Sequence, residues 1–290
     1  MTDREIRDSY EQNGFVVVEN IIDESELDPM RDFIKARVDK YAREQFAEGK
    51  LSSLYEDEPF TRRYAAICDD QGISPRGWNH GAFGREFYDL YTLPSIIRIV
   101  NFMLGSEVSS DGRSGLRTKL PGSEVASFPW HQDSQYYDQP TIGKKERHTE
   151  PLHVVSVWLP LVEATVANGC LWFIPGSHRW GLLDGARRED SNVRMDEDVE
   201  TRGTPVPVPL EPGSALFFSN LSIHGSKLNI TKGSRWSIDF RYFPTPDRAD
   251  LNPEQRKAAV YMANRTWPFV VLSNGPKTSF EEWEAKYQRK

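Results

Sequence analysis

The sequence predicts a mainly β fold with flanking helices, in which an antiparallel sandwich or barrel forms the middle of the chain. From about residue 106 to residue 245, short β-branched and aromatic runs recur at regular intervals between Gly, Pro and Asn residues. This spacing is typical of antiparallel strands joined by turns. No helical run separates the strands, so a parallel α/β sheet is disfavoured. Strands are expected at 116–120, 154–161, 170–174, 215–219 and 235–243.

The two ends of the chain predict helices around this core. Residues 3–12 favour a helix that ends at Gly14, and 15–18 form a short strand. Apolar residues at spacings of three and four predict a helix from about residue 27 to residue 41 and a second helical stretch over 87–104, which Pro94 interrupts. Two stretches, 48–85 and 183–203, lack periodicity and are expected to be irregular, the second as a long exposed loop.

The whole chain, residues 1–290, is predicted to form one domain. Residues 1–105 form a mixed, mainly helical support, residues 106–245 form the β core, and residues 246–290 form a C-terminal helical extension.

Composition excludes several classes of protein. The chain carries 36 Lys and Arg against 43 Asp and Glu, a net charge of −7, without a basic stripe. Nucleic acid is therefore not an expected partner. We expect no membrane partner either, because no apolar run approaches the roughly 18 residues of a membrane span and neither end shows a signal peptide or lipidation motif. The expectation is a cytoplasmic monomer or homodimer that acts on a small molecule. Two cysteines offer no disulfide framework or thiolate zinc cluster.

Histidines are the candidates for metal chemistry, and two of the six have a carboxylate two residues later. His148 with Glu150 lies in a charged segment typical of a solvated loop. His131 with Asp133 instead lies between the aromatic run FPW and two tyrosines. Residues i and i+2 of an extended chain point to one face, so His131 and Asp133 can bind one metal ion together.

A third ligand is expected from another strand, and His224 is the candidate because the apolar strand 215–218 leads to it. Two imidazoles and one carboxylate leave further positions open on the ion, which is the arrangement of non-haem iron oxygenases. Zinc accepts the same ligands, so a mononuclear metal hydrolase stays open on ligand type.

Arg235 favours iron. It follows His224 on a strand where alternation places Arg235, Ser237, Asp239 and Arg241 on one face. An arginine that points into a barrel needs an anion, and a carboxylate is its best partner. A dicarboxylate cosubstrate meets that need, and an ion pair with Asp239 is the structural alternative.

Four segments in this order, PWHQD, VWLPLVEATVANGCLWFIPGSH, IHGSKLN and Arg235, resemble the phytanoyl-CoA dioxygenase family of Fe(II)- and 2-oxoglutarate-dependent oxygenases. The resemblance covers roughly residues 106 to 245. It implies a double-stranded β-helix, the cupin-like jelly roll, with helices packed outside. It also implies Fe(II), 2-oxoglutarate and O2 as cofactor and cosubstrates, with conversion of 2-oxoglutarate to succinate.

Position by position, the resemblance implies that His131, Asp133 and His224 bind the iron. It places on Arg235 the role of holding the distal carboxylate of 2-oxoglutarate. Halogenases of this superfamily replace the carboxylate ligand with a small residue so that chloride can bind. Because Asp133 is present, the expected chemistry is hydroxylation, or another oxidation of a C–H bond, of a small organic molecule.

Three further residues match positions around the cosubstrate in this family. Ser237 matches a hydroxyl that assists the arginine in related oxygenases. Trp158 matches a tryptophan that lines the cosubstrate pocket, and Lys119 matches a basic residue often found there. Ordinary core packing for Trp158 and a solvated strand end for Lys119 are the structural alternatives.

Two rival functions stay open at this point. One is a metal-dependent jelly-roll enzyme without 2-oxoglutarate, such as a cupin-type dioxygenase or a zinc hydrolase. The other is a non-catalytic jelly-roll binding module, which the intact set of three ligands disfavours. The substrate cannot be read from the sequence, although the acidic loop 183–203 favours a neutral or cationic molecule over an acyl-CoA.

Overall fold

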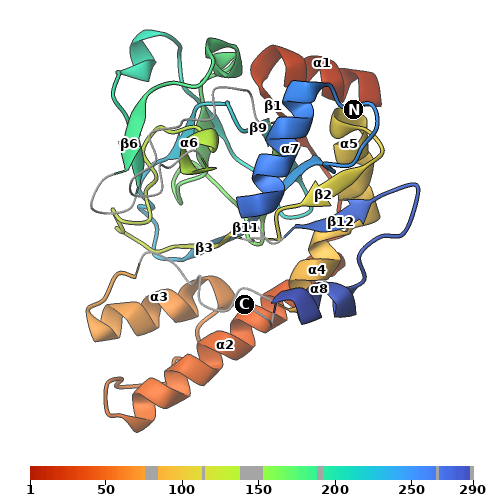
Figure 1. Ribbon diagram of the computed structural model, residues 1–290. Helices are drawn as coiled ribbons and strands as arrows, with labels where there is room; N and C mark the ends of the chain where they lie inside the picture. Colours follow the sequence, from red (N-terminus) through yellow and green to blue (C-terminus); the bar gives the residue numbers. More distant parts are fainter. Residues whose placement is uncertain (76–83, 113–114, 138–152, 188–191, 266–267, 288–290) are drawn as a thin grey trace.

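The computed structural model describes residues 1–75, 84–112, 115–137, 153–187, 192–265 and 268–287. Its centre is a seven-stranded antiparallel sheet, here called the major sheet (Figure 1). The strand order is β1 (Phe15–Val18), β9 (Ala215–Ser219), β4 (Val155–Pro160), β11 (Arg235–Pro244), β2 (Val108–Ser110) and β12 (Phe269–Leu272), and β3 (Gly115–Lys119) pairs with the first half of β11.

A second antiparallel sheet, the minor sheet, has the order β10 (His224–Ser226), β5 (Leu171–Phe173) and β8 (Val206–Val208). The two sheets face each other through aromatic rings. Phe173 of the minor sheet lies 4.6 Å from Phe15 and 5.3 Å from Phe218 of the major sheet, measured between ring centroids. This is the predicted jelly-roll architecture, two layers of antiparallel strands with helices outside.

The central strand β11 shows the predicted alternation. Trp236 and Phe240 point to the outer face of the major sheet, where they contact Phe60 and Tyr91 at centroid distances of 6.0 and 4.4 Å. The alternating set Arg235, Ser237, Asp239 and Arg241 lies on the inner face, toward the minor sheet. One strand therefore contributes apolar side chains to the core on its outer face and polar side chains to the space between the two sheets on its inner face.

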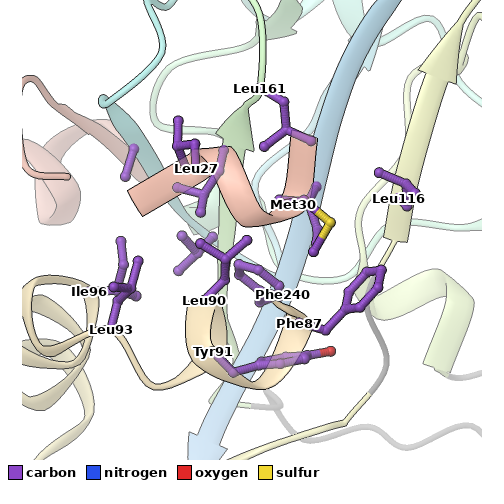
Figure 2. Packing of buried hydrophobic residues seen from close by; sticks show 14 of the residues in the cluster. Leu27, Met30, Phe87, Leu90, Tyr91, Leu93, Ile96, Leu116, Leu161 and Phe240 are labelled. Atoms are coloured by element: carbon purple, nitrogen blue, oxygen red, sulfur yellow. The ribbon is translucent and has the colours of Figure 1, made fainter. Parts of the chain in front are cut away.

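Helices cover the outer face of the major sheet, and α2, α3, α4 and α8 gather on one side of it in Figure 1. Buried positions of α2 recur every four residues from Met30 to Ala42, so that one helix face meets the core. Figure 2 shows Met30 with Phe87 and Tyr91 of α4 around Phe240. The helices are α1 (Asp3–Asn13), α2 (Asp28–Ala47), α3 (Phe60–Gln71), α4 (Arg85–Tyr91), α5 (Pro94–Leu104), α6 (Ser134–Tyr137), α7 (Pro253–Arg265) and α8 (Phe280–Tyr287).

Three stretches differ from the expectation. The segment 48–85, predicted to be irregular, contains α3. This helix was not predicted because five consecutive buried residues, from Tyr64 to Cys68, conceal the helical period of the sequence. The loop 183–203 contains a two-stranded ribbon of β6 (Gly185–Arg187) and β7 (Val193–Met195), followed by a 3-10 turn over Val199–Thr201. The C-terminal region is not only helical, since β12 joins the major sheet beside β2. None of the helices within the described ranges has the length and apolar character that a membrane crossing requires.

Candidate active site

Two of the predicted metal ligands are joined by their main chains. His131 and His224 form an antiparallel bridge in which the backbone N–H of each residue donates to the carbonyl of the other at 3.0 Å. The bridge adds the segment around His131 to the free edge of β10, the strand that carries His224. The imidazole rings consequently lie side by side, with centroids 4.2 Å apart.

The ring orientation of both histidines is fixed by hydrogen bonds. Nδ1 of His131 lies 2.8 Å from the carbonyl of Pro129, and Nδ1 of His224 lies 2.9 Å from the carbonyl of Ser222. A carbonyl only accepts, so each Nδ1 carries the proton and each Nε2 presents a lone pair. This is the tautomer that a metal-binding histidine needs.

Asp133 completes the set with one of its two oxygens. Oδ1 lies 4.0 Å from Nε2 of His131 and 3.7 Å from Nε2 of His224. Oδ2 accepts hydrogen bonds from Ser156 at 2.6 Å and from Nη2 of Arg241 at 3.1 Å. One oxygen of the carboxylate is therefore bound by the protein, and the other points toward the two histidines.

The three ligand atoms lie within 4.8 Å of one another and belong to buried residues. A donor set of two imidazole nitrogens and one carboxylate oxygen fits Fe(II) and leaves coordination positions for other ligands. The donor chemistry of the site thus accepts the metal that the sequence predicted.

Electrostatics keep the ligands in their metal-binding forms. Burial lowers the pKa of His131 to about 3 and lowers that of His224 below its ordinary value. Burial alone would raise the pKa of Asp133, but the charge of Arg241 and the hydrogen bond from Ser156 hold it below its usual range. Near pH 7 the imidazoles are neutral and the carboxylate is ionised.

Arg235 lies on the inner face of β11 and is 4 % exposed. Within the described part of the chain, its Nε and Nη1 have no hydrogen-bond partner. Asp239, the alternative partner considered from the sequence, instead binds Arg117 and Arg241. None of the acids in the described ranges binds this guanidinium, and a buried guanidinium without an anion is costly, so Arg235 is a candidate to bind one.

Ser237 and Lys119 lie close to this arginine on the same face. The hydroxyl of Ser237 is buried and also lacks a partner among the described residues. Lys119 of β3 is paired in register with Arg235, and its Nζ donates to the carbonyl of Ala126 at 3.0 Å and to Ser226 Oγ at 2.7 Å. Burial, and then the charge of Arg235, lower the pKa of Lys119 to about 6.

Trp158 of β4 forms one wall of this region. Its ring lies 5.2 Å from the guanidinium carbon of Arg235. Ser156, which binds Asp133, is two residues earlier on the same face of β4, a separation of roughly 7 Å along a strand. Trp158 therefore lies between Arg235 and the part of β4 where Ser156 binds the metal ligand Asp133.

The other two histidines that the structure describes, His153 and His178, do not join the site. The ring of His178 contacts the carbonyl of Glu11 near α1, and His153 lies beside Phe243 and α7. His80 and His148 lie outside the described residues. Sequence reasoning assigned no role to Ser156 or Arg241, the two residues that contact Asp133. Only the pairing of β4 with β11, which places them opposite each other, identifies them.

Fold and site together define a class, the jelly-roll dioxygenases with a mononuclear metal centre. The chain belongs to the phytanoyl-CoA dioxygenase (PhyH) family, whose model matches residues 10–237. This membership confirms the predicted class, an Fe(II)- and 2-oxoglutarate-dependent dioxygenase. Among curated relatives, a probable phytanoyl-CoA dioxygenase of Caenorhabditis elegans is 26% identical over 82% of this chain and 74% of its own length. The human peroxisomal phytanoyl-CoA dioxygenase is 25% identical over 82% of this chain and 67% of its own length.

Solved structures share the fold. The SnoN epimerase of nogalamycin biosynthesis, in complex with Fe3+, alpha ketoglutarate and nogalamycin RO, is 20% identical with a TM-score of 0.53, over 84% of each chain. EctD from S. alaskensis, with 2-oxoglutarate and 5-hydroxyectoine, is 21% identical with a TM-score of 0.51, over 86% of this chain and 78% of its own. The monooxygenase ThoJ reaches a TM-score of 0.56 at 17% identity and covers 98% of this chain and 100% of its own. These likenesses confirm the jelly-roll fold class.

Proposed function

We propose that the protein hydroxylates a C–H bond of a small organic molecule, with His131, Asp133 and His224 holding Fe(II). The observation that carries the proposal is the convergence of three buried ligand atoms within 4.8 Å, together with a buried arginine whose Nε and Nη1 have no hydrogen-bond partner among the described residues. When bound, iron and 2-oxoglutarate supply the oxidation: 2-oxoglutarate and O2 become succinate and CO2, and one oxygen atom enters the substrate C–H bond.

The residues of this chain bind and orient the cosubstrate. Arg235 pairs with the distal carboxylate of 2-oxoglutarate, and Ser237 donates its free hydroxyl to the same group. Trp158 packs along the cosubstrate and keeps water from the ion pair. The keto acid end then points toward the metal ligands, since Trp158 beside Arg235 is two residues from Ser156, which binds Asp133.

Lys119 supplies a second cation for the same carboxylate. Its amine is already held by Ala126 and Ser226, so it is placed before the cosubstrate enters. A dicarboxylate beside it stabilises the protonated amine and restores the charge that burial removes.

Asp133 supports hydroxylation over halogenation. Its Oδ1 occupies the ligand position that a halide would need, and Oδ2 is fixed by Ser156 and Arg241. No small residue stands at this position, so the site offers a third protein ligand and no chloride pocket.

Aromatic rings around the metal ligands favour an apolar or ring-bearing part of the substrate. The ring of Tyr136 lies 5.2 Å from that of His131, edge to face, and the ring of Phe128 lies 6.1 Å from it. Such rings bind hydrocarbon and other rings, and they hold the reacting carbon without hydrogen bonds.

Anaerobic titration of the full chain with Fe(II) and 2-oxoglutarate tests the proposal. We expect a weak visible band from the chelate of 2-oxoglutarate on iron, and succinate formation after O2 is admitted. Asp133→Ala and His131→Ala should lose both signals. His178→Ala, which removes a histidine far from the set, is the matched control and should keep them.

The rival functions predict different results. A cupin-type dioxygenase or zinc hydrolase would turn over without 2-oxoglutarate, and a binding module would bind the metal without consuming O2. Either result, or an unchanged band in Asp133→Ala, would reject the proposed function.

A further inference from the structure

A chain of alternating charges runs along the inner face of β11 and ends at the metal-binding carboxylate. Nε of Arg117 donates to Oδ1 of Asp239 at 2.9 Å, and Nη1 of Arg241 donates to Oδ2 of the same residue. Arg241 then reaches Oδ2 of Asp133 with Nη2 at 3.1 Å and Nε at 3.3 Å. One planar guanidinium thus joins two buried carboxylates.

We propose that Arg241, itself held by Asp239, is the positioning residue of the metal centre. It fixes the Asp133 carboxylate so that only Oδ1 is presented to the metal. This inference rests on the proposed metal site and adds a residue that touches neither metal nor cosubstrate.

The geometry supports a directional role for Arg241. The two oxygens of Asp133 are equivalent until Ser156 and Arg241 bind one of them. The guanidinium is rigid and its donors diverge toward two acceptors, so holding Asp239 also fixes the direction of the bonds to Asp133. A lysine has a single nitrogen on a flexible stem and cannot reproduce both directions.

Charge alone predicts the opposite effect on metal binding. Arg241 is a cation next to the site of another cation, so its charge repels the metal and competes for Asp133. If charge were its only contribution, neutralising Arg241 would tighten metal binding. If it positions Asp133, neutralising it weakens metal binding, and the sign of the change decides between the two.

Gly115 provides an independent way to disturb the chain of charges. Gly115 lies opposite Asp239 in the pairing of β3 with β11, and a Cβ at this position would overlap the Asp239 carboxylate. An alanine there changes no charge, but it forces the Asp239 carboxylate out of the position in which Arg241 binds it. The Asp239 carboxylate thus occupies the space that a methyl group at position 115 would need.

The test is the dissociation constant of Co(II), followed by its visible absorption, for the full chain without 2-oxoglutarate. We expect Arg241→Gln to weaken binding by about 10- to 100-fold, the usual cost of losing a group that orients a metal ligand. Arg241→Lys should recover only part of the loss, and Gly115→Ala should weaken binding without any change of charge.

Arg63→Gln is the matched control. Arg63 is an arginine of nearly equal side-chain exposure, 16 % against 15 % for Arg241, and it binds Asp39 far from the metal ligands. It should leave the Co(II) dissociation constant unchanged. The melting temperature of each metal-free variant separates a general loss of stability from a loss of metal affinity, and a variant that does not fold is replaced by Gly115→Ala or Arg241→Lys in the comparison.

Three results would overturn the inference: tighter or unchanged binding in Arg241→Gln, full recovery in Arg241→Lys, or equal weakening in Arg63→Gln. Wild-type protein that binds no Co(II) beyond the level of His131→Ala would instead reject the proposed metal site, and the inference with it. The two failures are therefore distinguishable.

Discussion

Arg235 lies directly opposite Lys119 in the antiparallel pairing of β11 with β3, so a buried guanidinium and a buried amine share one face of the major sheet. Side chains paired across antiparallel strands are close neighbours, and like charges at such positions destabilise the pairing. Protonation of Lys119 beside Arg235 is therefore unfavourable, and the charge of Arg235 contributes to its lowered pKa. The proposed binding of 2-oxoglutarate at this strand pair would favour the protonated amine again.

Arg235→Met should raise the requirement for 2-oxoglutarate. Removing one partner of a buried, hydrogen-bonded charge pair costs about 2–5 kcal/mol, so the KM for 2-oxoglutarate should rise roughly 30-fold or more. The rate at saturation should fall much less, because Arg235 does not bind the metal. Steady-state succinate formation over a range of 2-oxoglutarate concentrations checks this, and an unchanged KM would make Arg235 a structural residue.

Lys119→Met should stabilise the ligand-free protein. The folded pKa of Lys119 is lowered from 10.5 to about 6. Between these two pH values the unfolded chain binds a proton that the folded chain does not, so this group makes stability increase with pH. The variant loses that dependence, and it should gain about 0.5–2 kcal/mol near pH 7, with the gain shrinking toward pH 10. Urea unfolding of both proteins at pH 7, 8.5 and 9.5 measures the difference, and a constant difference across these pH values contradicts the assignment.

Binding of 2-oxoglutarate should take up a proton at pH 7.5 to 8. Lys119, with a pKa of about 6, is mostly neutral there, and a dianion beside it raises its proton affinity. Calorimetric titration in two buffers of different ionisation enthalpy gives the number of protons. We expect uptake that approaches one per cosubstrate in the wild type and disappears in Lys119→Met. Equal proton counts in the two proteins would show that Lys119 does not face the dianion.

Ser237→Ala should lower the affinity for 2-oxoglutarate and leave the stability of the ligand-free protein nearly unchanged. The hydroxyl of Ser237 is buried without a partner among the described residues, so its removal costs the ligand-free protein little. A hydrogen bond to a bound carboxylate contributes about 1.5–3 kcal/mol, so 2-oxoglutarate affinity should fall roughly 10- to 150-fold. The intensity of the chelate band against 2-oxoglutarate concentration reports affinity, and thermal melting reports stability. Lower stability with unchanged affinity would mean that the hydroxyl serves the fold.

Six strands, β1, β3, β4, β5, β9 and β11, were predictable because each carries its own pattern, whereas β2, β8 and β10 were not predicted. β9 was predicted with its observed bounds from its apolar run, and β11 to within one residue from its alternation of polar and apolar residues. β12 was not predicted, because its four residues form a strand only by pairing with β2, far away along the chain. Short segments of this kind take their conformation from tertiary contacts.

The candidate site was predictable only where residue type implies chemistry. The convergence of His131, Asp133 and His224 was predicted and is found. The contact of Arg241 with Asp133 was not, because an arginine near an aspartate on a strand suggests an ordinary ion pair. The register that sets Arg241 opposite Ser156, and both beside Asp133, depends on how β4 meets β11.

The main-chain bridge between His131 and His224 affects how the protein takes up its metal ion. Because ordinary peptide hydrogen bonds set the spacing of the imidazoles, the polypeptide assembles its coordination pair during folding, before any cation arrives. The conformational entropy of gathering the ligands is thus lost in folding and not at metal uptake. A chelator should strip the ion and leave a folded protein, which a second divalent cation can refill without refolding.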